Sequence, residues 1–157
     1  MKNTDCEWVF FSTCEEQTEA LGAALSKVLA PGDFVALWGG LGAGKTAFTR
    51  GLARALGDDS GASPTFTIVH EYETQPPVFH FDVYRLGSEE DLYDIGYDDY
   101  VRRNGVIVME WPERVEGILP EKRLDISIER LDDHSRRLTV RGLSGAAAQR
   151  LEEEWKR

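Results

Sequence analysis

Residues 39–46, GGLGAGKT, follow the apolar run FVALW and decide which fold the chain can adopt. Their glycines disfavour both a stable helix and a stable strand, because glycine loses more conformational freedom on ordering than any other residue. They match the pattern G-x-x-x-x-G-K-[ST] of the P-loop, in which backbone N–H groups turn inward around phosphate oxygens. Side chains in the glycine positions would block that approach. The sequence therefore predicts a phosphate-binding loop.

The segments on both sides of this loop fit the same prediction. Residues 33–38 contain the apolar run FVALW and are typical of a buried strand, and after the loop Phe48, Leu52 and Leu56 recur at helical spacing before Gly57. The N-terminus of that helix would point its positive end at a bound anion. A strand, a glycine-rich loop and a helix in this order form the phosphate-binding unit of P-loop proteins.

Two residues of the loop have predicted roles of their own. Lys45 is expected to reach the β and γ phosphates of a nucleotide, and the Thr46 hydroxyl is expected to be a ligand of Mg²⁺. The residues predicted to bind the nucleotide from the loop and the first helical turn are Gly40, Leu41, Gly42, Ala43, Gly44, Lys45, Thr46 and Ala47.

Two carboxylates at strand ends are candidates for the magnesium shell that a P-loop enzyme needs. Asp82 ends the run VFHFD, and Glu110 ends VIVME, which is typical of a fully buried central strand. Removing such a carboxylate from water costs free energy unless a cation compensates. We expect Glu110 to take the usual strand-end position, and Asp82 to bind the metal or one of its waters.

Two further residues are candidates near the nucleotide. Trp111 follows Glu110 where open α/β folds bind ligands, so its indole could pack against the base or the ribose; the alternative is a tryptophan at the edge of the core. Thr65, in the sequence Ser-Pro-Thr, could approach Mg²⁺ or the γ phosphate as switch segments do; the alternative is a plain turn before a strand.

The other elements are predicted from periodicity and turn residues. An amphipathic helix should start at a capping box of Thr13 and Glu16 and continue to about Leu29. Strands 66–72 and 78–84 flank a Pro-Pro pair and predict an antiparallel hairpin. Two further strands are expected at 124–130 and 136–141, before a polar helix at 144–157.

The acidic segment 87–100 has two interpretations. Ser88 and Asp91 have capping-box spacing, and Glu89 and Glu90 suit the N-terminus of a solvated helix. The alternative is a surface that docks a partner, because aromatic and apolar side chains lie among the acidic ones, as they often do at interfaces.

The composition indicates one domain covering residues 1–157. A chain of 157 residues with 41% hydrophobic side chains can bury a single core, and a βαβ unit beside a hairpin predicts a three-layer, P-loop NTPase-like α/β fold with a mixed, mostly parallel sheet.

The net charge of −10 opposes autonomous binding to nucleic acid or an anionic membrane. No apolar run approaches the length of a membrane span, so we expect a cytoplasmic protein. Cys6 and Cys14 lack a metal or redox spacing and are expected to be reduced.

Four motifs, GGLGAGKT, SPTFTIVHEYE, HFDVYRL and VMEWPERV, occur in this order and together resemble the bacterial TsaE family, also called YjeE. The resemblance implies a Mg²⁺-dependent ATPase that binds ATP and supports formation of N6-threonylcarbamoyladenosine at position 37 of tRNA. It implies a TsaB-TsaD complex as protein partner, with tRNA reached only through these partners. The implied catalytic and metal-site residues are Lys45, Thr46, Thr65, Asp82 and Glu110, with Trp111 beside the nucleotide.

Two other functions compete with this one. A small-molecule kinase needs an arginine-bearing lid, and no arginine-rich insertion follows the hairpin; a nucleotide-controlled binding module would differ only in having negligible turnover. Fast hydrolysis needs a cation against the transition-state charge. Arg50 and Arg54 are expected to face away from the phosphates, and Arg85, Arg102 and Arg103 have no predicted place. We therefore expect an ATPase that is slow alone and is completed by its partner.

Overall fold

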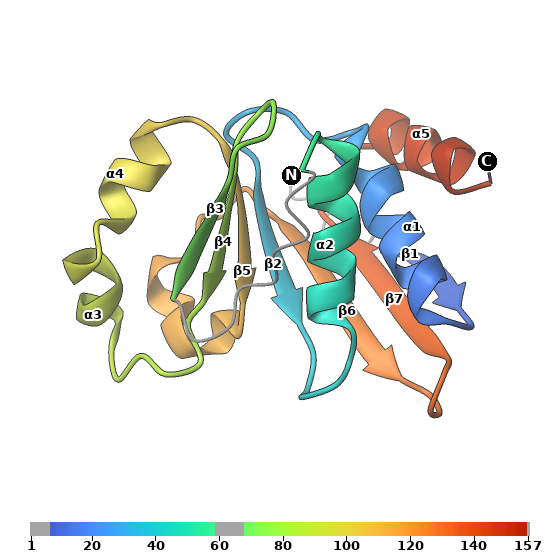
Figure 1. Ribbon diagram of the computed structural model, residues 1–157, viewed down its shortest axis with the longest axis horizontal. Coiled ribbons are helices and arrows are strands. Elements are labelled where there is room, and N and C mark those ends of the chain that lie inside the picture. Colours follow the sequence, from blue (N-terminus) through green and yellow to red (C-terminus); the bar gives the residue numbers. More distant parts are fainter. Residues whose placement is uncertain (1–6, 59–67, 157) are drawn as a thin grey trace.

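The computed structural model describes residues 7–58 and 68–156, which share one seven-stranded sheet of order β1-β7-β6-β2-β5-β4-β3 (Figure 1). The strands are β1 (Glu7–Ser12), β2 (Phe34–Trp38), β3 (Val69–Tyr72), β4 (Val78–Asp82), β5 (Val106–Glu110), β6 (Leu124–Arg130) and β7 (Arg136–Arg141). The helices are α1 (Glu15–Ser26), α2 (Lys45–Ala55), α3 (Glu89–Asp94), α4 (Tyr97–Arg102), α5 (Gly145–Trp155) and the 3₁₀ helix η1 (Pro112–Ile118).

The sheet is mixed, with its parallel pairs in the centre. The strands β6, β2, β5 and β4 pair in parallel, whereas β3 on β4, β7 on β6 and β1 on β7 are antiparallel. All strands except β3 and β7 therefore run in one direction. The predicted mixed, mostly parallel sheet is confirmed, and the hairpin across the Pro-Pro pair is β3–β4.

Helices cover both faces of the sheet, as the alternation of side chains along a strand requires. In β2, Val35 and Leu37 pack into the core under α1, α2 and α5, while Phe34 and Ala36 pack into the core under α3, α4 and η1. Both faces of β2 are buried, which explains its uninterrupted apolar sequence. The three-layer α/β fold is thus confirmed (Figure 1).

The helices α1 and α2 approach each other closely through two glycines. A Cβ atom built on Gly22 would lie 2.1 Å from the Phe48 carbonyl oxygen, and one on Gly51 would lie 2.0 Å from the Glu19 carbonyl oxygen. Both obstacles are backbone atoms, so the helices would have to move apart to admit a methyl group. This contact fixes α2, and with it the loop that precedes α2.

We predict that Gly51→Ala lowers the free energy of unfolding by about 1–3 kcal/mol, even though alanine favours a helix, because the added methyl overpacks the interface. Urea unfolding measures the change. The control is Gly145→Ala, since a Cβ there meets nothing within 4 Å and stability should not fall. Equal stability of the two variants would show that α1 and α2 have room to separate.

Two predicted helix starts differ in detail from the structure. The N-cap of α1 is Cys14, so the capping box of Thr13 and Glu16 is wrong. Instead, the Thr13 N–H and hydroxyl both donate to the Gln17 side-chain oxygen, at 2.7 and 3.0 Å. The helix ends at Ser26, short of the predicted Leu29, because its last N–H groups turn to carbonyls three residues back.

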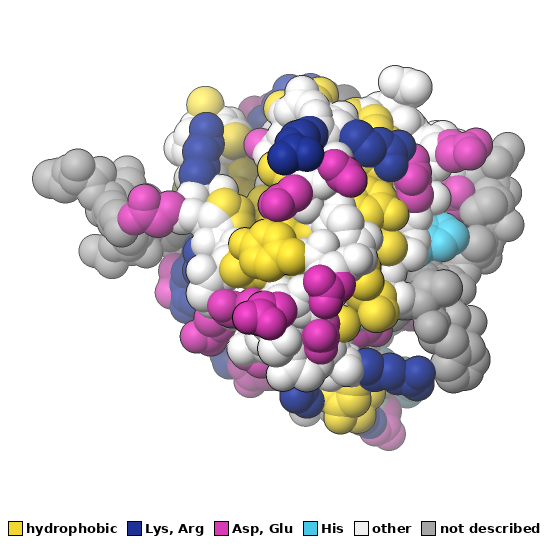
Figure 2. Space-filling view, turned by 90° about the vertical axis from the view of Figure 1, so that its left-hand side faces the viewer, with side chains coloured by type: hydrophobic (Ala, Val, Ile, Leu, Met, Phe, Trp, Pro, Cys, Tyr) yellow, Lys and Arg dark blue, Asp and Glu magenta, His cyan; other side chains and the backbone are white. Residues whose placement is uncertain are grey.

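The acidic segment forms two short helices and not one. Gly96 has φ +91° and separates α3 from α4 with a left-handed residue that a continuous helix does not contain. Ser88 caps α3 by accepting the Asp91 N–H at 3.4 Å, while the Asp91 carboxylate accepts from Gly87. Figure 2 shows apolar and acidic side chains interspersed on this face, which suits either interpretation of the segment.

The C-terminal half follows the sequence prediction closely. β6 and β7 have the predicted bounds, and the Ser144 hydroxyl accepts the Ala147 N–H at the start of α5. β4 ends at Asp82, two residues earlier than predicted. No helix within the described ranges is both long and apolar enough to cross a membrane.

Candidate functional site

A cleft of about 490 Å³ opens where β2 leads through the glycine-rich loop into α2. It lies at the carboxyl ends of the parallel strands, where open α/β sheets bind ligands. The loop and the first helical turn contribute Leu41, Gly42, Ala43, Gly44, Lys45, Thr46 and Ala47 to its lining. The ends of β4 and β5 contribute Asp82, Glu110 and the following Trp111. The other lining residues are Glu15, Thr18, Arg50, Asp133, His134 and Arg136.

The loop needs glycine for two different physical reasons. Gly42 and Gly44 have φ +74° and +110°, a region that L side chains rarely adopt. At Gly39, whose φ is +155°, the further reason is space, because a Cβ would lie 2.7 Å from the Ile128 carbonyl oxygen in β6. Gly40 has neither constraint, since a Cβ there meets nothing within 4 Å. The loop conformation is therefore specified by three of its four glycines.

Lys45, the first residue of α2, is 95% buried, with 5% of its surface exposed. Its ammonium donates to the Gly39 carbonyl oxygen at 2.7 Å and lies 3.4 Å from the centre of the Trp111 ring. Burial lowers the pKa of this ammonium from its ordinary value, and nearby acidic groups oppose the shift. Both contacts are with neutral groups, so a phosphate can replace them without breaking an ion pair.

The alternation along β4 and β5 brings three polar side chains to the α2 face of the sheet. Asp82 lies opposite Glu110 in the parallel register, and His80 lies two residues earlier on β4, so all three share one face. The His80 Nε2 atom is 2.5 Å from a Glu110 carboxylate oxygen, and both side chains are buried. The juxtaposition of Asp82 and Glu110 follows directly from strand register.

The tautomer of this histidine follows from the hydrogen-bond partners of its two ring nitrogens. Within residues 7–58 and 68–156, the buried His80 Nδ1 has no hydrogen-bond partner. A proton on Nδ1 would be a buried N–H without an acceptor, which costs free energy. We therefore assign the ring proton to Nε2, where it donates to Glu110 and orients the carboxylate.

The donor set suits a hard divalent cation such as Mg²⁺. Thr46 is exposed on the cleft, and Asp82 is half-buried with one oxygen accepting the Tyr84 N–H at 3.1 Å. In the described part of the chain, no three His, Cys, Asp or Glu residues form a metal cluster. Mg²⁺ typically takes one or two carboxylates, several waters and substrate phosphates, so this sparse set of oxygens fits it.

Trp111 has a backbone conformation that is uncommon for a side chain of its size. Its φ of +62° and ψ of +46° are left-handed, which costs of order 1–2 kcal/mol for a residue with a Cβ. This turn places the indole at the cleft beside Lys45, and the centre of its ring is 4.8 Å from the centre of the Tyr84 ring. The predicted role beside the base or ribose stays a prediction, and Thr65 lies outside the described residues.

The arginines are arranged differently from what the sequence suggested. Arg50 borders the cleft and does not simply face away, but its guanidinium is bound to Glu15 at 2.5 Å and Glu19 at 2.8 Å. Arg136, which sequence reasoning missed, donates to carbonyl oxygens of the loop. Side chains two residues apart on a strand share a face, so the position of Asp82 could have identified His80 as a member of the site. No local sequence pattern connects residue 136 to the loop.

The fold and the loop define a P-loop NTPase-like α/β protein. The family described as "Threonylcarbamoyl adenosine biosynthesis protein TsaE" matches residues 12–138, and the chain belongs to this family. This membership confirms the resemblance found in the four sequence motifs.

Individual relatives agree with the family match. The chain is 43% identical to the tRNA threonylcarbamoyladenosine biosynthesis protein TsaE of Treponema pallidum over 130 residues, which are 82% of this chain and 96% of that protein. It is 43% identical to the protein of the same name from Bacillus subtilis over 126 residues, 79% and 78% of the two chains. The crystal structure of Bacillus subtilis YdiB superposes with a TM-score of 0.77 at 34% identity, covering 96% of this chain and 95% of that one.

We predict that His80 and Glu110 are coupled by about 1–3 kcal/mol, because removing either leaves the other buried without its partner. A double-mutant cycle with His80→Leu and Glu110→Leu, followed by urea unfolding, measures the coupling. A second cycle pairing His80→Leu with Lys122→Ala, an exposed residue outside this cleft, is the control and should be additive. Additivity of the first cycle within about 0.5 kcal/mol would contradict the assignment of this hydrogen bond.

Proposed function

We propose that this protein is a Mg²⁺-dependent ATPase that binds ATP in the loop 39–46 and acts with the TsaB-TsaD complex in tRNA threonylcarbamoyladenosine synthesis. One observation carries the proposal: the buried Lys45 ammonium and the register-paired Asp82 and Glu110 converge on one cleft beside the glycine-rich loop. Family membership supplies the biosynthetic context. The acidic pair, the lysine and the loop are the parts that nucleotide hydrolysis needs.

The proposed role of each residue follows from its position and its exposure. The loop amides and Lys45 bind phosphate oxygens, with the ammonium exchanging its contact to the Gly39 carbonyl for the nucleotide. Thr46 and Asp82 are the Mg²⁺ ligands in this proposal, since both border the cleft and are accessible. When bound, the metal neutralises charge that develops on the phosphates.

Glu110 has a different environment and therefore a different part. Its carboxylate is buried and is oriented by His80. It is therefore suited to orient a water for attack, or to hydrogen-bond a water of the metal's coordination shell. Thr65 remains a proposed contributor from the Ser-Pro-Thr segment, and Trp111 is the proposed contact for the base or ribose.

The arrangement of the arginines at the cleft supports the proposal that the protein alone hydrolyses ATP slowly. Arg50 is engaged by two glutamates, and Arg136 is engaged by carbonyl oxygens of the loop. Neither is poised to approach the γ phosphate without giving up these bonds. The cation that stabilises the transition state would then come from the partner complex.

We predict that Lys45→Ala and Glu110→Ala each lower partner-stimulated ATP hydrolysis by about 100-fold or more, because each removes a charged group from the transition-state environment. Hydrolysis and multi-turnover tRNA modification are measured with and without TsaB-TsaD. Lys122→Ala is the matched control, since Lys122 is exposed and lies outside this cleft. It should behave as the unaltered protein.

Different results identify the competing functions. Transfer of phosphate to a small acceptor would indicate a kinase. Repeated tRNA modification by a hydrolysis-dead Glu110→Ala protein would indicate a nucleotide-controlled binding module. Hydrolysis that is equally fast with and without partners would contradict partner activation.

A further inference from the structure

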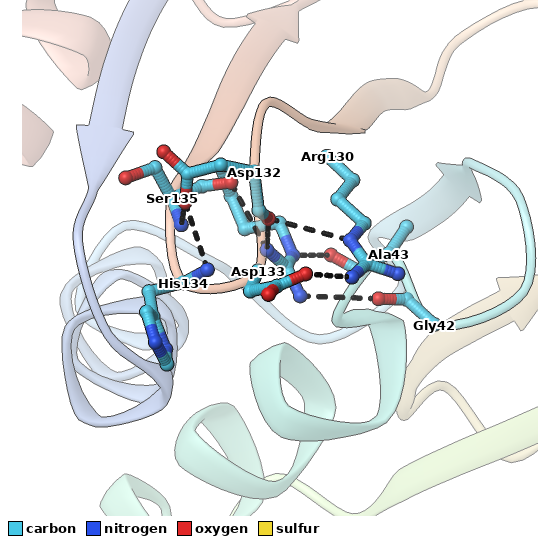
Figure 3. Close-up of polar contacts among 8 residues, drawn as sticks. Gly42, Ala43, Arg130, Asp132, Asp133, His134 and Ser135 are labelled. Atoms are coloured by element: carbon cyan, nitrogen blue, oxygen red, sulfur yellow. Dashed lines mark hydrogen bonds and ion pairs between the residues drawn. The ribbon is translucent and has the colours of Figure 1, made fainter.

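An arginine from a distant strand holds the outer side of the glycine-rich loop. Arg136 begins β7, and its Nε atom donates to the Ala43 carbonyl oxygen at 2.9 Å, while one terminal nitrogen donates to the Gly42 carbonyl oxygen at 3.2 Å. The other terminal nitrogen donates to the carbonyl oxygens of Asp132 and Ser135, at 2.9 and 3.0 Å. The guanidinium thus links the β6–β7 turn to the loop, whose Gly42 and Ala43 lie beside that turn in Figure 3.

These bonds constrain which way the loop amides point. In a planar trans peptide, the C=O and the following N–H point in opposite directions. Holding the Gly42 carbonyl toward Arg136 therefore directs the Ala43 N–H away from the guanidinium and into the turn of the loop itself, where it donates to the Gly40 carbonyl oxygen at 3.2 Å. Holding the Ala43 carbonyl likewise turns the Gly44 N–H away from the guanidinium. Phosphate binding by a P-loop requires amides that are already turned inward.

The charge of Arg136 is not neutralised by the acidic residues of the adjacent turn. Asp133 pairs with Arg130 at 2.6 Å, and the Asp132 carboxylate accepts the N–H groups of His134 and Ser135 (Figure 3). All the acceptors that the structure gives Arg136 in the described part of the chain are main-chain carbonyls. Its positive charge therefore adds to the potential that attracts an anion to the cleft.

The strand that carries Arg136 is held firmly against the loop. Arg136 pairs with Arg130 at the end of the β6–β7 ladder, and β6 lies beside β2, from which the loop departs. The loop also contacts β6 at Gly39, which has no room for a Cβ beside the Ile128 carbonyl. The β6–β7 hairpin therefore supports the loop at its base and along its outer side.

We propose that Arg136 is a positioning residue of the nucleotide site: its guanidinium holds the Gly42 and Ala43 carbonyls outward, so that the loop is formed before the phosphates arrive. This inference rests on the proposed nucleotide binding. A preformed loop raises affinity because less ordering accompanies binding. The fork geometry is essential, since one guanidinium reaches two successive carbonyls and also the turn, whereas a lysine ammonium is a point donor.

The test compares Arg136→Lys and Arg136→Gln with Arg137→Gln, a neighbour whose guanidinium pairs with Glu129 and not with the loop. Both Arg136 variants are expected to raise the Kd for Mg·ADP, measured by calorimetry, about tenfold, the equivalent of one charged hydrogen bond. Lysine should give no rescue, and Arg137→Gln should bind normally. A Kd within about twofold of the unaltered protein in both Arg136 variants would overturn the proposal.

Two further readouts separate positioning from other roles. Partner-stimulated single-turnover hydrolysis at saturating Mg·ATP should change by less than about threefold, because the filled loop is ordered by its ligand. A large fall in that rate with an unchanged Kd would make Arg136 a transition-state cation and overturn the proposal. A lower thermal midpoint with an unchanged Kd would show a purely structural role.

Hydrogen exchange of the free protein tests the loop without nucleotide. The Ala43 amide should exchange about tenfold faster in Arg136→Lys than in the unaltered protein, because its peptide has lost the carbonyl contact. Unchanged exchange would overturn the inference. If the unaltered protein binds no nucleotide, the proposed function fails, and this exchange measurement still decides whether Arg136 holds the loop.

Discussion

The buried ammonium of Lys45 is the charge around which this site is arranged. Desolvating a lysine is costly, and the direct contacts of this ammonium within residues 7–58 and 68–156 are the Gly39 carbonyl oxygen and the face of Trp111. The negative charges that favour its protonated form come from Glu110, Glu113 and Asp82, all at the carboxyl ends of β4 and β5 or just beyond. A triphosphate would supply a close anionic partner, which the described residues do not provide. The free-energy cost of burying this ammonium is thus one that the proposed phosphate ligand would lower.

Strand register explains how these groups meet. Because β4 and β5 are parallel and Asp82 is paired with Glu110, two carboxylates that are far apart in sequence lie side by side on the α2 face. A shift of one residue would turn one of them to the opposite core. His80 belongs to the same alternation and occupies the space behind Glu110. The sheet therefore sets both the position and the environment of the acidic pair, and the two carboxylates differ in burial although they are neighbours.

The sequence predicts the parts of this site that depend on local pattern. The loop of residues 39–46 and the strand ends at Asp82 and Glu110 follow from glycine spacing and apolar runs, and the structure brings them together. The sequence pattern does not predict the split between α3 and α4, because a single left-handed glycine, Gly96, interrupts the apparent helical spacing. The contact of Arg136 with Ala43 joins residues 93 positions apart, and only the sheet order reveals it. Likewise, the pairing of Arg50 with glutamates depends on how α1 crosses α2.

The most direct test of the account is an NMR titration of the ¹⁵N-labelled protein with Mg·ADP. If the loop amides bind the phosphates, the largest shifts should fall on residues 42–46 and on the indole N–H of Trp111, with little change in α3 and α4. Binding with its largest shifts elsewhere, and with the amides of residues 42–46 unmoved, would contradict the assignment of this loop as the phosphate site.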